Sequence, residues 1–189
     1  MYRRRDRAGR VKMGGPILHC TYLLHDLAET QMWGRMLGAS LQAGDVIAMI
    51  GDLGAGKTTL TQAIARGMQI AEPVTSPTFA LAQEYLGRVP LFHFDPYRLD
   101  SAEAFAEIGF DEYFERGGVI VVEWADKIAP LLPEERLTLT LTLPQETGSP
   151  LVEAAPRTMS AEAVGVRYTT LLQNLDALSE IRPLLGLRA

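Results

Sequence analysis

Short apolar runs recur along the chain and are separated by longer segments with a different period. The runs at 17–24, 45–50 and 119–122 contain mainly apolar residues, which predicts buried strands. The last of these runs is the richest in β-branched side chains, so we expect it to lie in the centre of a sheet. Leucine alternates with threonine over 137–143, which predicts a strand with one face buried and the other in water.

The intervening segments carry apolar residues at the three- and four-residue spacing of helices. In the first of them, Asp26 and Glu29 form a start signal like a capping box, and Gly44 provides a stop. Its apolar stripe consists of Trp33, Met36, Leu37 and Leu41. Further helices are predicted over 58–66, over 100–115 with a break at Gly109, and over 164–181. Strands that alternate with helices indicate an α/β fold with a mostly parallel central sheet and flanking helices.

One stretch does not fit this alternation. It starts with Pro73 and Pro77, accompanied by three hydroxyl side chains, and it is predicted to be a loop because proline removes a backbone donor. Strand-like segments at 79–85 and 89–95 follow, with Gly87 in the turn between them. This pattern predicts a β-hairpin inserted into the α/β fold.

The chain has 189 residues, of which 47% are hydrophobic and 22% charged, and this fits one globular domain over 16–189. Within it, residues 144–163 carry no clear helix or strand signal. Cys20 is the single cysteine, which excludes an intrachain disulfide and favours a reducing compartment. No apolar run approaches the roughly 20 residues of a membrane span, and no secretory signal follows the N-terminal arginines. We therefore expect a cytoplasmic protein.

Basic residues concentrate near the N-terminus. Six of the 18 lie within the first twelve positions, which leaves 12 basic against 22 acidic residues in the rest of the chain. The rest of the chain is therefore acidic and poorly suited to binding the negatively charged backbone of a nucleic acid. We expect residues 1–15 to be an unstructured basic leader, and any direct contact with RNA to be confined to it.

The main chemical motif follows the strand at 45–50. Residues 51–58 read G-D-L-G-A-G-K-T, the pattern of a phosphate-binding loop (P-loop), and a predicted helix begins directly behind them. The glycines let backbone N–H groups turn toward an anion, and the helix N-terminus adds partial positive charge. Lys57 would reach the outer phosphates of a nucleotide, and the Thr58 hydroxyl would hold Mg²⁺. The predicted nucleotide-binding residues of the loop are Asp52, Leu53, Gly54, Ala55, Gly56, Lys57, Thr58 and Thr59.

Two carboxylates stand where predicted strands end. Asp95 ends the hairpin and Glu123 follows the central strand, and open α/β sheets bind ligands at the carboxyl edge of their strands. Asp95 is therefore a predicted metal ligand, with a surface acid in a turn as the alternative. Glu123 is predicted to lie at the metal and to face the γ-phosphate, either as a general base or as a group that orients water. Trp124 either packs or contacts the nucleotide or a partner, and His93 is interpreted as a packed side chain.

The sequence also narrows the nucleotide and leaves three classes of function. Ras-type GTPases read guanine with Asn-Lys-x-Asp, but the only asparagine, Asn174, precedes leucine, so ATP is favoured. An ATPase, a phosphotransferase with a small hydroxyl substrate and a nucleotide-gated binding module all agree with a P-loop. Ser76 and Thr78 offer oxygen atoms near the expected γ-phosphate, and their loop is either a switch or a rigid connector.

Four motifs together resemble the TsaE (YjeE) family. They are GDLGAGKTT at 51–59, VTSPTF at 74–79, HFDPYRL at 93–99 and VEWA at 122–125, and they occur in the family's order. The resemblance extends over 22–143 and returns weakly in the terminal helix. Pro96 departs from it, because the family usually has an apolar residue such as leucine there.

The resemblance implies a P-loop NTPase-like fold and a bacterial ATPase needed for the threonylcarbamoyl modification of tRNA adenosine 37. It implies ATP and Mg²⁺ as cofactors, and the TsaD and TsaB proteins as partners whose multi-turnover cycle the ATPase drives. It further implies that Lys57 and Thr58 bind phosphate and Mg²⁺, that Asp95 supports the metal, that the Ser76–Thr78 loop senses the nucleotide, and that Glu123 and Trp124 serve hydrolysis.

Overall fold

The computed structural model describes residues 15–99, 101–144, 156–178 and 185–187. Its strands are β1 (Ile17–Leu24), β2 (Val46–Gly51), β3 (Ala82–Tyr85), β4 (Leu91–Phe94), β5 (Val119–Val122), β6 (Arg136–Thr142), β7 (Arg157–Val164) and β8 (Leu185–Leu187). Its helices are α1 (Leu27–Ser40), α2 (Lys57–Gly67), α3 (Ala102–Ala106) and α4 (Val166–Leu178), with 3₁₀ helices η1 (Phe110–Glu115) and η2 (Ala125–Leu131). The predicted leader, apart from residue 15, lies outside the described residues.

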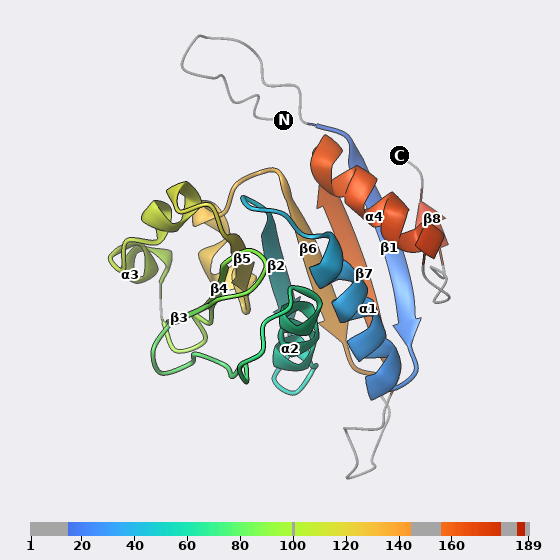
Figure 1. Cartoon of the computed structure of the whole chain (residues 1–189), viewed down its shortest axis with the longest axis horizontal. Coiled ribbons are helices and arrows are strands. Elements are labelled where there is room, and N and C mark those ends of the chain that lie inside the picture. Colours follow the sequence, from blue (N-terminus) through green and yellow to red (C-terminus); the bar gives the residue numbers. More distant parts are fainter. Residues whose placement is uncertain (1–14, 100, 145–155, 179–184, 188–189) are drawn as a thin grey trace.

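The strands form one sheet in the order β3-β4-β5-β2-β6-β7-β1-β8 (Figure 1). Strands β4, β5, β2 and β6 pair in parallel, whereas β3, β7, β1 and β8 join through antiparallel pairing. Because β1 is antiparallel to β7, and β7 to β6, strand β1 points the same way as the four parallel strands. The predicted mostly parallel α/β sheet is confirmed, and β3 with β4 forms the predicted hairpin.

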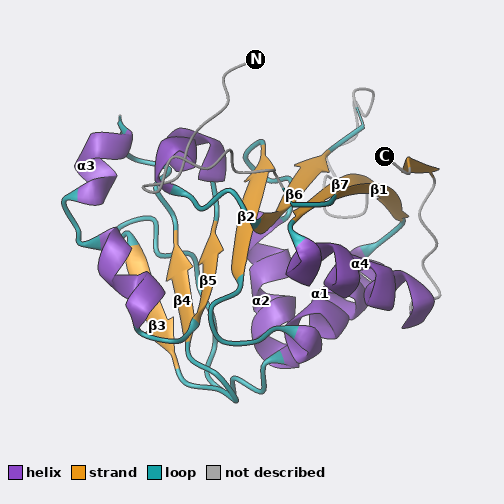
Figure 2. Ribbon diagram, turned by 90° about the horizontal axis from the view of Figure 1, so that it is seen from above, coloured by secondary structure: helices purple, strands orange, loops and turns teal. Residues whose placement is uncertain are grey.

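Strand β2 lies at the centre of the molecule and is covered on both faces. Ile47 and Met49 contribute to one hydrophobic cluster, and Val46 and Ala48 contribute to a second. This division arises because successive side chains of a strand point to opposite faces. The first cluster is completed by α1, α2 and α4, which lie side by side in Figure 2, and the second by α3, η1 and η2. A sheet covered in this way holds the ends of β2, β4 and β5 in fixed relation to one another.

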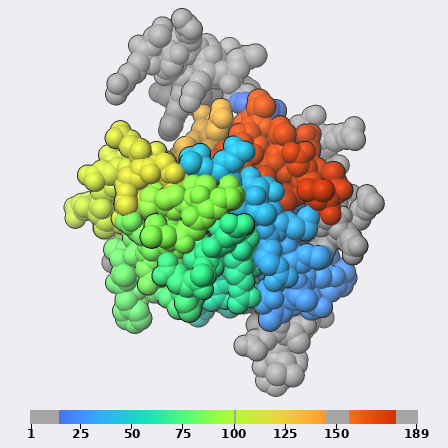
Figure 3. Space-filling model, viewed as in Figure 1, coloured from blue at the N-terminus to red at the C-terminus, as the bar shows by residue number. Residues whose placement is uncertain are grey.

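Helices α1 and α2 are in close contact, and their surfaces adjoin in Figure 3. A Cβ atom at Gly38 would lie only 2.0 Å from the carbonyl oxygen of Ile64, so a larger residue would force the helices apart. Trp33 and Leu37, predicted as part of the apolar stripe of α1, are almost completely buried. The Asp26 side chain caps α1 by accepting a hydrogen bond from the Glu29 N–H, as the start signal predicts. This packing fixes α2, the helix that follows the P-loop.

The helical segment predicted over 100–115 is divided at Gly109, as expected, because Gly109 takes φ +75° between α3 and η1. The predicted strand at 79–85 starts only at Ala82, since Leu81 adopts φ +64° and donates its N–H to the Pro77 carbonyl in a turn. The chain therefore turns at Phe79 to Leu81, beside the loop of hydroxyl side chains.

Strand β7 comes from the stretch that carries no clear sequence signal. Residues 145–155 of that stretch lie outside the described residues, but 157–164 pair with both β6 and β1. Met159, Ala161 and Ala163 are buried in alternation with more exposed positions. The strand connects the parallel half of the sheet to the antiparallel half, and it brings Arg157 to the P-loop.

Candidate nucleotide-binding site

Glycine shapes the loop between β2 and α2. Gly51 has φ +147°, and a Cβ atom there would lie 2.4 Å from the Leu141 carbonyl oxygen, so no side chain fits beside β6. Gly56, at φ +105°, is the N-cap of α2, and no side chain caps the helix. The first N–H groups of α2 are therefore available to a ligand, and helix N-termini bind phosphate. The predicted loop has the strand, turn and helix that a P-loop requires.

Lys57 folds back over its own loop. Its Nζ donates to the Gly51 carbonyl at 2.6 Å and to the Asp52 carbonyl at 2.9 Å, and it lies 3.6 Å from the ring centroid of Trp124. The residue is only 5% exposed. Burial lowers the pKa of Lys57, and the neighbouring carboxylate of Glu123 opposes this change. Phosphate oxygens placed in the loop would compete with these carbonyls for the ammonium group.

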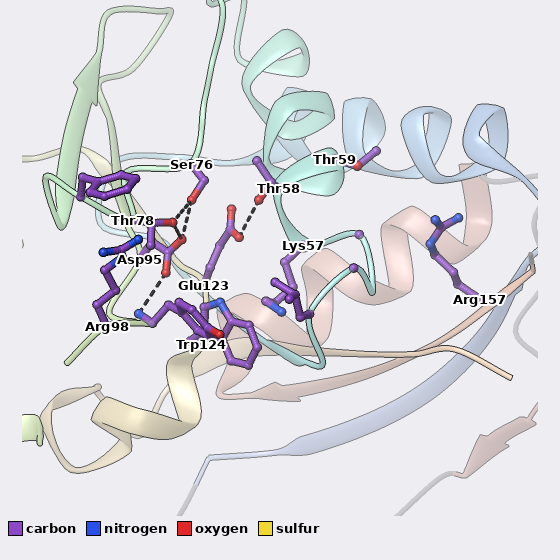
Figure 4. Close-up of a pocket in the computed structure, with 15 residues that line it drawn as sticks. Lys57, Thr58, Thr59, Ser76, Thr78, Asp95, Arg98, Glu123, Trp124 and Arg157 are labelled. Carbon is purple, nitrogen blue, oxygen red and sulfur yellow. Dashed lines mark hydrogen bonds between the residues drawn. The ribbon is translucent and has the colours of Figure 1, made fainter. Parts of the chain in front are cut away.

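Glu123 follows β5 directly and is 2% exposed. Its Oε2 accepts a hydrogen bond from the Thr58 hydroxyl at 2.8 Å (Figure 4), and its Oε1 accepts one from the Thr61 hydroxyl at 3.2 Å. His93 Nε2 lies 2.9 Å from the same Oε1. A carboxylate buried at a strand end and bonded to the P-loop threonine is placed to act on Mg²⁺ and on water at a γ-phosphate.

Asp95 follows β4 and is also 2% exposed. Its Oδ2 accepts hydrogen bonds from the hydroxyl groups of Ser76 and Thr78, and its Oδ1 accepts one from the Tyr97 N–H. Asp95 is therefore not a surface acid in a turn, because its carboxylate is buried and accepts three hydrogen bonds. In this structure it fastens the Ser76–Thr78 loop, whereas the contact with the Thr58 hydroxyl belongs to Glu123.

Trp124 continues from Glu123 with φ +54°, a left-handed conformation that is uncommon outside glycine. Its indole lies under the ammonium of Lys57 and against the ring of Tyr97, with ring centroids 4.8 Å apart. Backbone strain of this kind clusters at ligand sites. Trp124 therefore packs against Lys57 and Tyr97 and also lines the cleft. The prediction that it packs is thus compatible with the alternative that it contacts a nucleotide.

The site forms a cleft of about 680 Å³, a size suited to a nucleotide. The predicted residues that line it are Leu53, Gly54, Gly56, Lys57, Thr58, Thr59, Ser76, Thr78, Asp95, Glu123 and Trp124. Asp52 and Ala55 do not line it, although the Asp52 carbonyl bonds to Lys57. The tertiary fold therefore brings the loop, the two strand-end carboxylates and the hydroxyl side chains to one place (Figure 4).

The cleft also contains residues that the motifs do not predict. Arg157, 7% exposed, extends from β7 and donates its Nε–H to the Ala55 carbonyl at 3.1 Å. The Arg98 guanidinium stacks 3.9 Å from the ring centroid of Phe79, whose side chain is 84% exposed. Arg157 lies beside the P-loop, away from Arg98 and Asp95 (Figure 4). Arg98 and Phe79 lie within recognised motifs, whereas Arg157 belongs to none and reaches the cleft only through tertiary contacts.

The residues present fit a magnesium ion together with a nucleotide. Hydroxyl and carboxylate oxygens are the ligands that Mg²⁺ prefers, and the Thr58 hydroxyl and Glu123 carboxylate lie in contact. Among the described residues no group of three His, Cys, Asp or Glu side chains could hold a metal ion. A Mg²⁺ ion in this cleft would therefore share its coordination with phosphate oxygens and water, as it does in nucleotide sites.

None of the helices in the described part of the chain has the length and apolar character needed to cross a membrane. The predicted compartment stays a prediction.

The fold and the cleft define an α/β protein of the P-loop class. Within that class, residues 24–149 match the family described as "Threonylcarbamoyl adenosine biosynthesis protein TsaE", and the chain belongs to this family. The resemblance found in the motifs is thus confirmed.

Individual relatives agree with the family match. A protein of Bacillus subtilis named "tRNA threonylcarbamoyladenosine biosynthesis protein TsaE" is 40% identical over 149 residues, which cover 78% of this chain and 88% of the relative. Proteins of the same name from Treponema pallidum and a Nostoc species are 43% and 41% identical, over 60% and 70% of this chain and 84% and 83% of their own lengths. The crystal structure of Bacillus subtilis YdiB is 34% identical, with a TM-score of 0.71 over 86% of this chain and 97% of that one.

Proposed function

We propose that this chain is a Mg²⁺-dependent ATPase that acts with the TsaD and TsaB proteins in the threonylcarbamoyl modification of tRNA adenosine 37, in the cytoplasm. The observation that carries the ATPase is the hydrogen bond between Thr58 of the P-loop and the buried carboxylate of Glu123. The family description and the names of the relatives support the pathway.

The loop would bind the phosphates before any chemistry takes place. The uncapped N–H groups at the start of α2 would donate to the β-phosphate, and Lys57 would exchange its loop carbonyls for β- and γ-oxygens. When bound, Mg²⁺ would be held by Thr58 with the support of Glu123 and Asp95, and it would neutralise charge on the β- and γ-phosphates. Because Lys57 is buried against Trp124, its charge acts in an environment of low dielectric constant.

Hydrolysis would then take place beside Glu123. A water oxygen forms a bond to the γ-phosphorus while the bond from that phosphorus to the β,γ-bridging oxygen breaks, so that ADP leaves with the bridging oxygen. Glu123 orients the water and accepts its proton, which passes on to the released phosphate or to solvent. The carboxylate is held by Thr58 and Thr61, so little reorganisation is needed.

The charge of the chain favours protein partners over direct binding of tRNA. Outside the first twelve residues, 12 basic side chains stand against 22 acidic ones, and phosphate backbones bind to basic surfaces. A role as an ATPase that drives other proteins agrees with this balance better than a role as the tRNA-binding component.

Phosphate release from Mg-ATP, with no acceptor added, tests the activity. We expect release of phosphate from Mg-ATP by the wild-type chain, with GTP a poorer substrate.

Glu123→Gln should slow turnover about a hundredfold while nucleotide affinity stays nearly unchanged, because only the group acting on water is lost. Asp95→Asn should instead weaken Mg²⁺-dependent binding, because the variant loses the charge that supports the metal and the anchor of Ser76 and Thr78.

Two other results would point to other functions. Turnover that requires a small hydroxyl acceptor would identify a phosphotransferase. Tight nucleotide binding without release of phosphate, alone or with TsaD and TsaB, would identify a nucleotide-gated binding module. Equal loss of binding in both carboxylate variants would contradict the division of roles between them.

A further inference from the structure

His93 is a polar side chain at a position where the fold calls for an apolar one. It lies within β4 and is completely buried. Phe92 and Phe94, its neighbours in the strand, point into one hydrophobic cluster, and Leu91 belongs to the other. Strand alternation therefore places His93 on the face of Leu91, which is covered by α2. A leucine could pack at this position, so the presence of a buried imidazole calls for an explanation.

That reason is the contact with Glu123. His93 Nε2 lies 2.9 Å from Oε1 of Glu123, and the two side chains are 0% and 2% exposed. A carboxylate that accepts hydrogen bonds from both threonines cannot itself donate, so the hydrogen of this bond resides on Nε2. Within the described residues the other ring nitrogen, Nδ1, has no hydrogen-bond partner. The ring thus gives up one buried hydrogen bond while making the one to Glu123.

The other donor to Oε1 is shared. The Thr61 hydroxyl lies 3.2 Å from Oε1, but it also lies 3.1 Å from the Lys57 carbonyl and 3.8 Å from the sulfur of Met49. A hydroxyl has a single hydrogen, which it cannot give fully to three acceptors. His93 is consequently the dedicated donor to Oε1, while Thr58 bonds to Oε2.

We propose that His93 is a positioning residue that fixes the orientation of the Glu123 carboxylate through its Nε2–H. This inference rests on the proposed ATP hydrolysis. With Oε1 held from the side of β4, Oε2 stays directed at Thr58 and the expected γ-phosphate. His93 is completely buried and does not line the cleft, so it acts only through Glu123.

Kinetics of two substitutions test the proposal. His93→Leu fills the space but donates no hydrogen bond, so kcat for phosphate release should fall about tenfold with KM for Mg-ATP within twofold. His93→Gln keeps an N–H donor near the position of Nε2 and should recover part of that loss. Leu91→Ala, on the same strand and face, is the control: it should lower the melting temperature without a comparable loss of kcat.

A double variant separates positioning from packing. If His93 acts through Glu123, adding His93→Leu to Glu123→Gln should leave the residual rate unchanged. A further tenfold loss would overturn the proposal, as would a wild-type rate in His93→Leu or an equal rate loss in Leu91→Ala.

An observable that does not depend on turnover is the tautomer of His93. Nitrogen-15 NMR of the labelled full chain should show an Nε2–H tautomer, and Glu123→Gln should shift the Nε2–H resonance. An Nδ1–H tautomer, or a resonance that Glu123→Gln does not move, would refute the contact. If the wild-type chain releases no phosphate while the tautomer is as expected, the proposed hydrolysis fails but His93 still orients Glu123.

Discussion

At the scale of single residues, Lys57 has two sets of possible partners. In this structure it bonds to the carbonyls of Gly51 and Asp52, and nucleotide phosphates would offer charged acceptors in their place. Lys57→Ala should weaken Mg-ATP binding ten- to a hundredfold, since a hydrogen bond to a charged group contributes about 1.5–3 kcal/mol. A calorimetric titration of each protein with Mg-ATP measures the change.

Lys127 provides the matched control for that titration. Its Nζ also bonds to two carbonyls, those of Tyr97 and Leu99, and lies near an aromatic ring, but it does not line the cleft. Lys127→Ala removes the same charge and should bind Mg-ATP within about twofold of the wild type. Wild-type affinity in Lys57→Ala would contradict the P-loop assignment.

Site residues can be predicted from the sequence where a single motif determines both the residue type and its position in the fold. The cleft-lining residues Leu53, Gly54 and Gly56 to Thr59 follow from a local pattern, because residues adjacent in sequence form this backbone loop, whereas the predicted Ala55 does not line the cleft. The role of His93 could not be predicted, because the sequence pattern of a histidine inside an apolar run is the same whether the ring only packs or also donates a hydrogen bond. Arg157 is likewise remote from every motif, and only the pairing of β7 with β6 brings it to Ala55.

At the scale of elements, the fully buried and strongly alternating strands were predictable, as were α2 and α1 with its Asp26 N-cap. The predicted stop at Gly44 was wrong, because α1 ends at Ser40 with Leu41 as its C-cap. Strand β7 was not, although its burial alternates along its length. Its inward residues include alanine, which has low β-propensity, and its first inward residue is a buried arginine. The start of β3 was predicted wrongly because Leu81 adopts a left-handed conformation, which nothing about a leucine in the sequence indicates.

The segment from Pro73 to Leu81 is the element on which regulation would depend. Its Ser76 and Thr78 are fastened to Asp95, yet the adjacent Phe79 is highly exposed. Hydrogen bonds of a few hydroxyl groups can be exchanged for phosphate or Mg²⁺ contacts, which is how P-loop switches respond to nucleotide. Two prolines restrict the same segment, so a rigid connector is the alternative.

Hydrogen exchange distinguishes a switch from a connector. Exchange in residues 74–81 should fall when a non-hydrolysable ATP analogue and Mg²⁺ bind, and ADP should protect less, because only the analogue supplies a γ-phosphate. The turn at 86–89, which joins β3 and β4 away from the cleft, serves as the internal control and should not change. Equal exchange in the apo, ADP and analogue states would identify the segment as a rigid connector.

At the scale of the whole molecule, the sheet has two halves with different roles. The parallel half carries the P-loop, Asp95 and Glu123 at the ends of β2, β4 and β5. The antiparallel half contributes Arg157 from β7, and Arg157 bonds to the loop from the side opposite the carboxylates (Figure 4). The order of the strands thus explains why one cleft draws on residues from so much of the chain.

We therefore expect Arg157 to contribute both to the stability of the antiparallel half of the sheet and to nucleotide binding. It holds the Ala55 carbonyl, and a Cβ atom at Gly56 would lie 3.1 Å from its Nε, so the guanidinium packs directly on the loop. Arg157→Ala should weaken ADP and ATP binding alike, about tenfold, because it loosens the loop that binds the phosphates common to both nucleotides. Glu123 lies elsewhere in the cleft, so kcat at saturating ATP should change little.

Titrations with ADP and ATP, combined with thermal unfolding, measure this effect. Arg136→Ala is the matched control, since Arg136 begins the adjacent strand β6 and also bonds to a backbone carbonyl, that of Pro133, but does not line the cleft. It should lower stability without reducing affinity. If both arginine variants lose stability and neither loses affinity, Arg157 only joins β7 to the core, and the antiparallel half of the sheet supports the cleft without taking part in nucleotide binding.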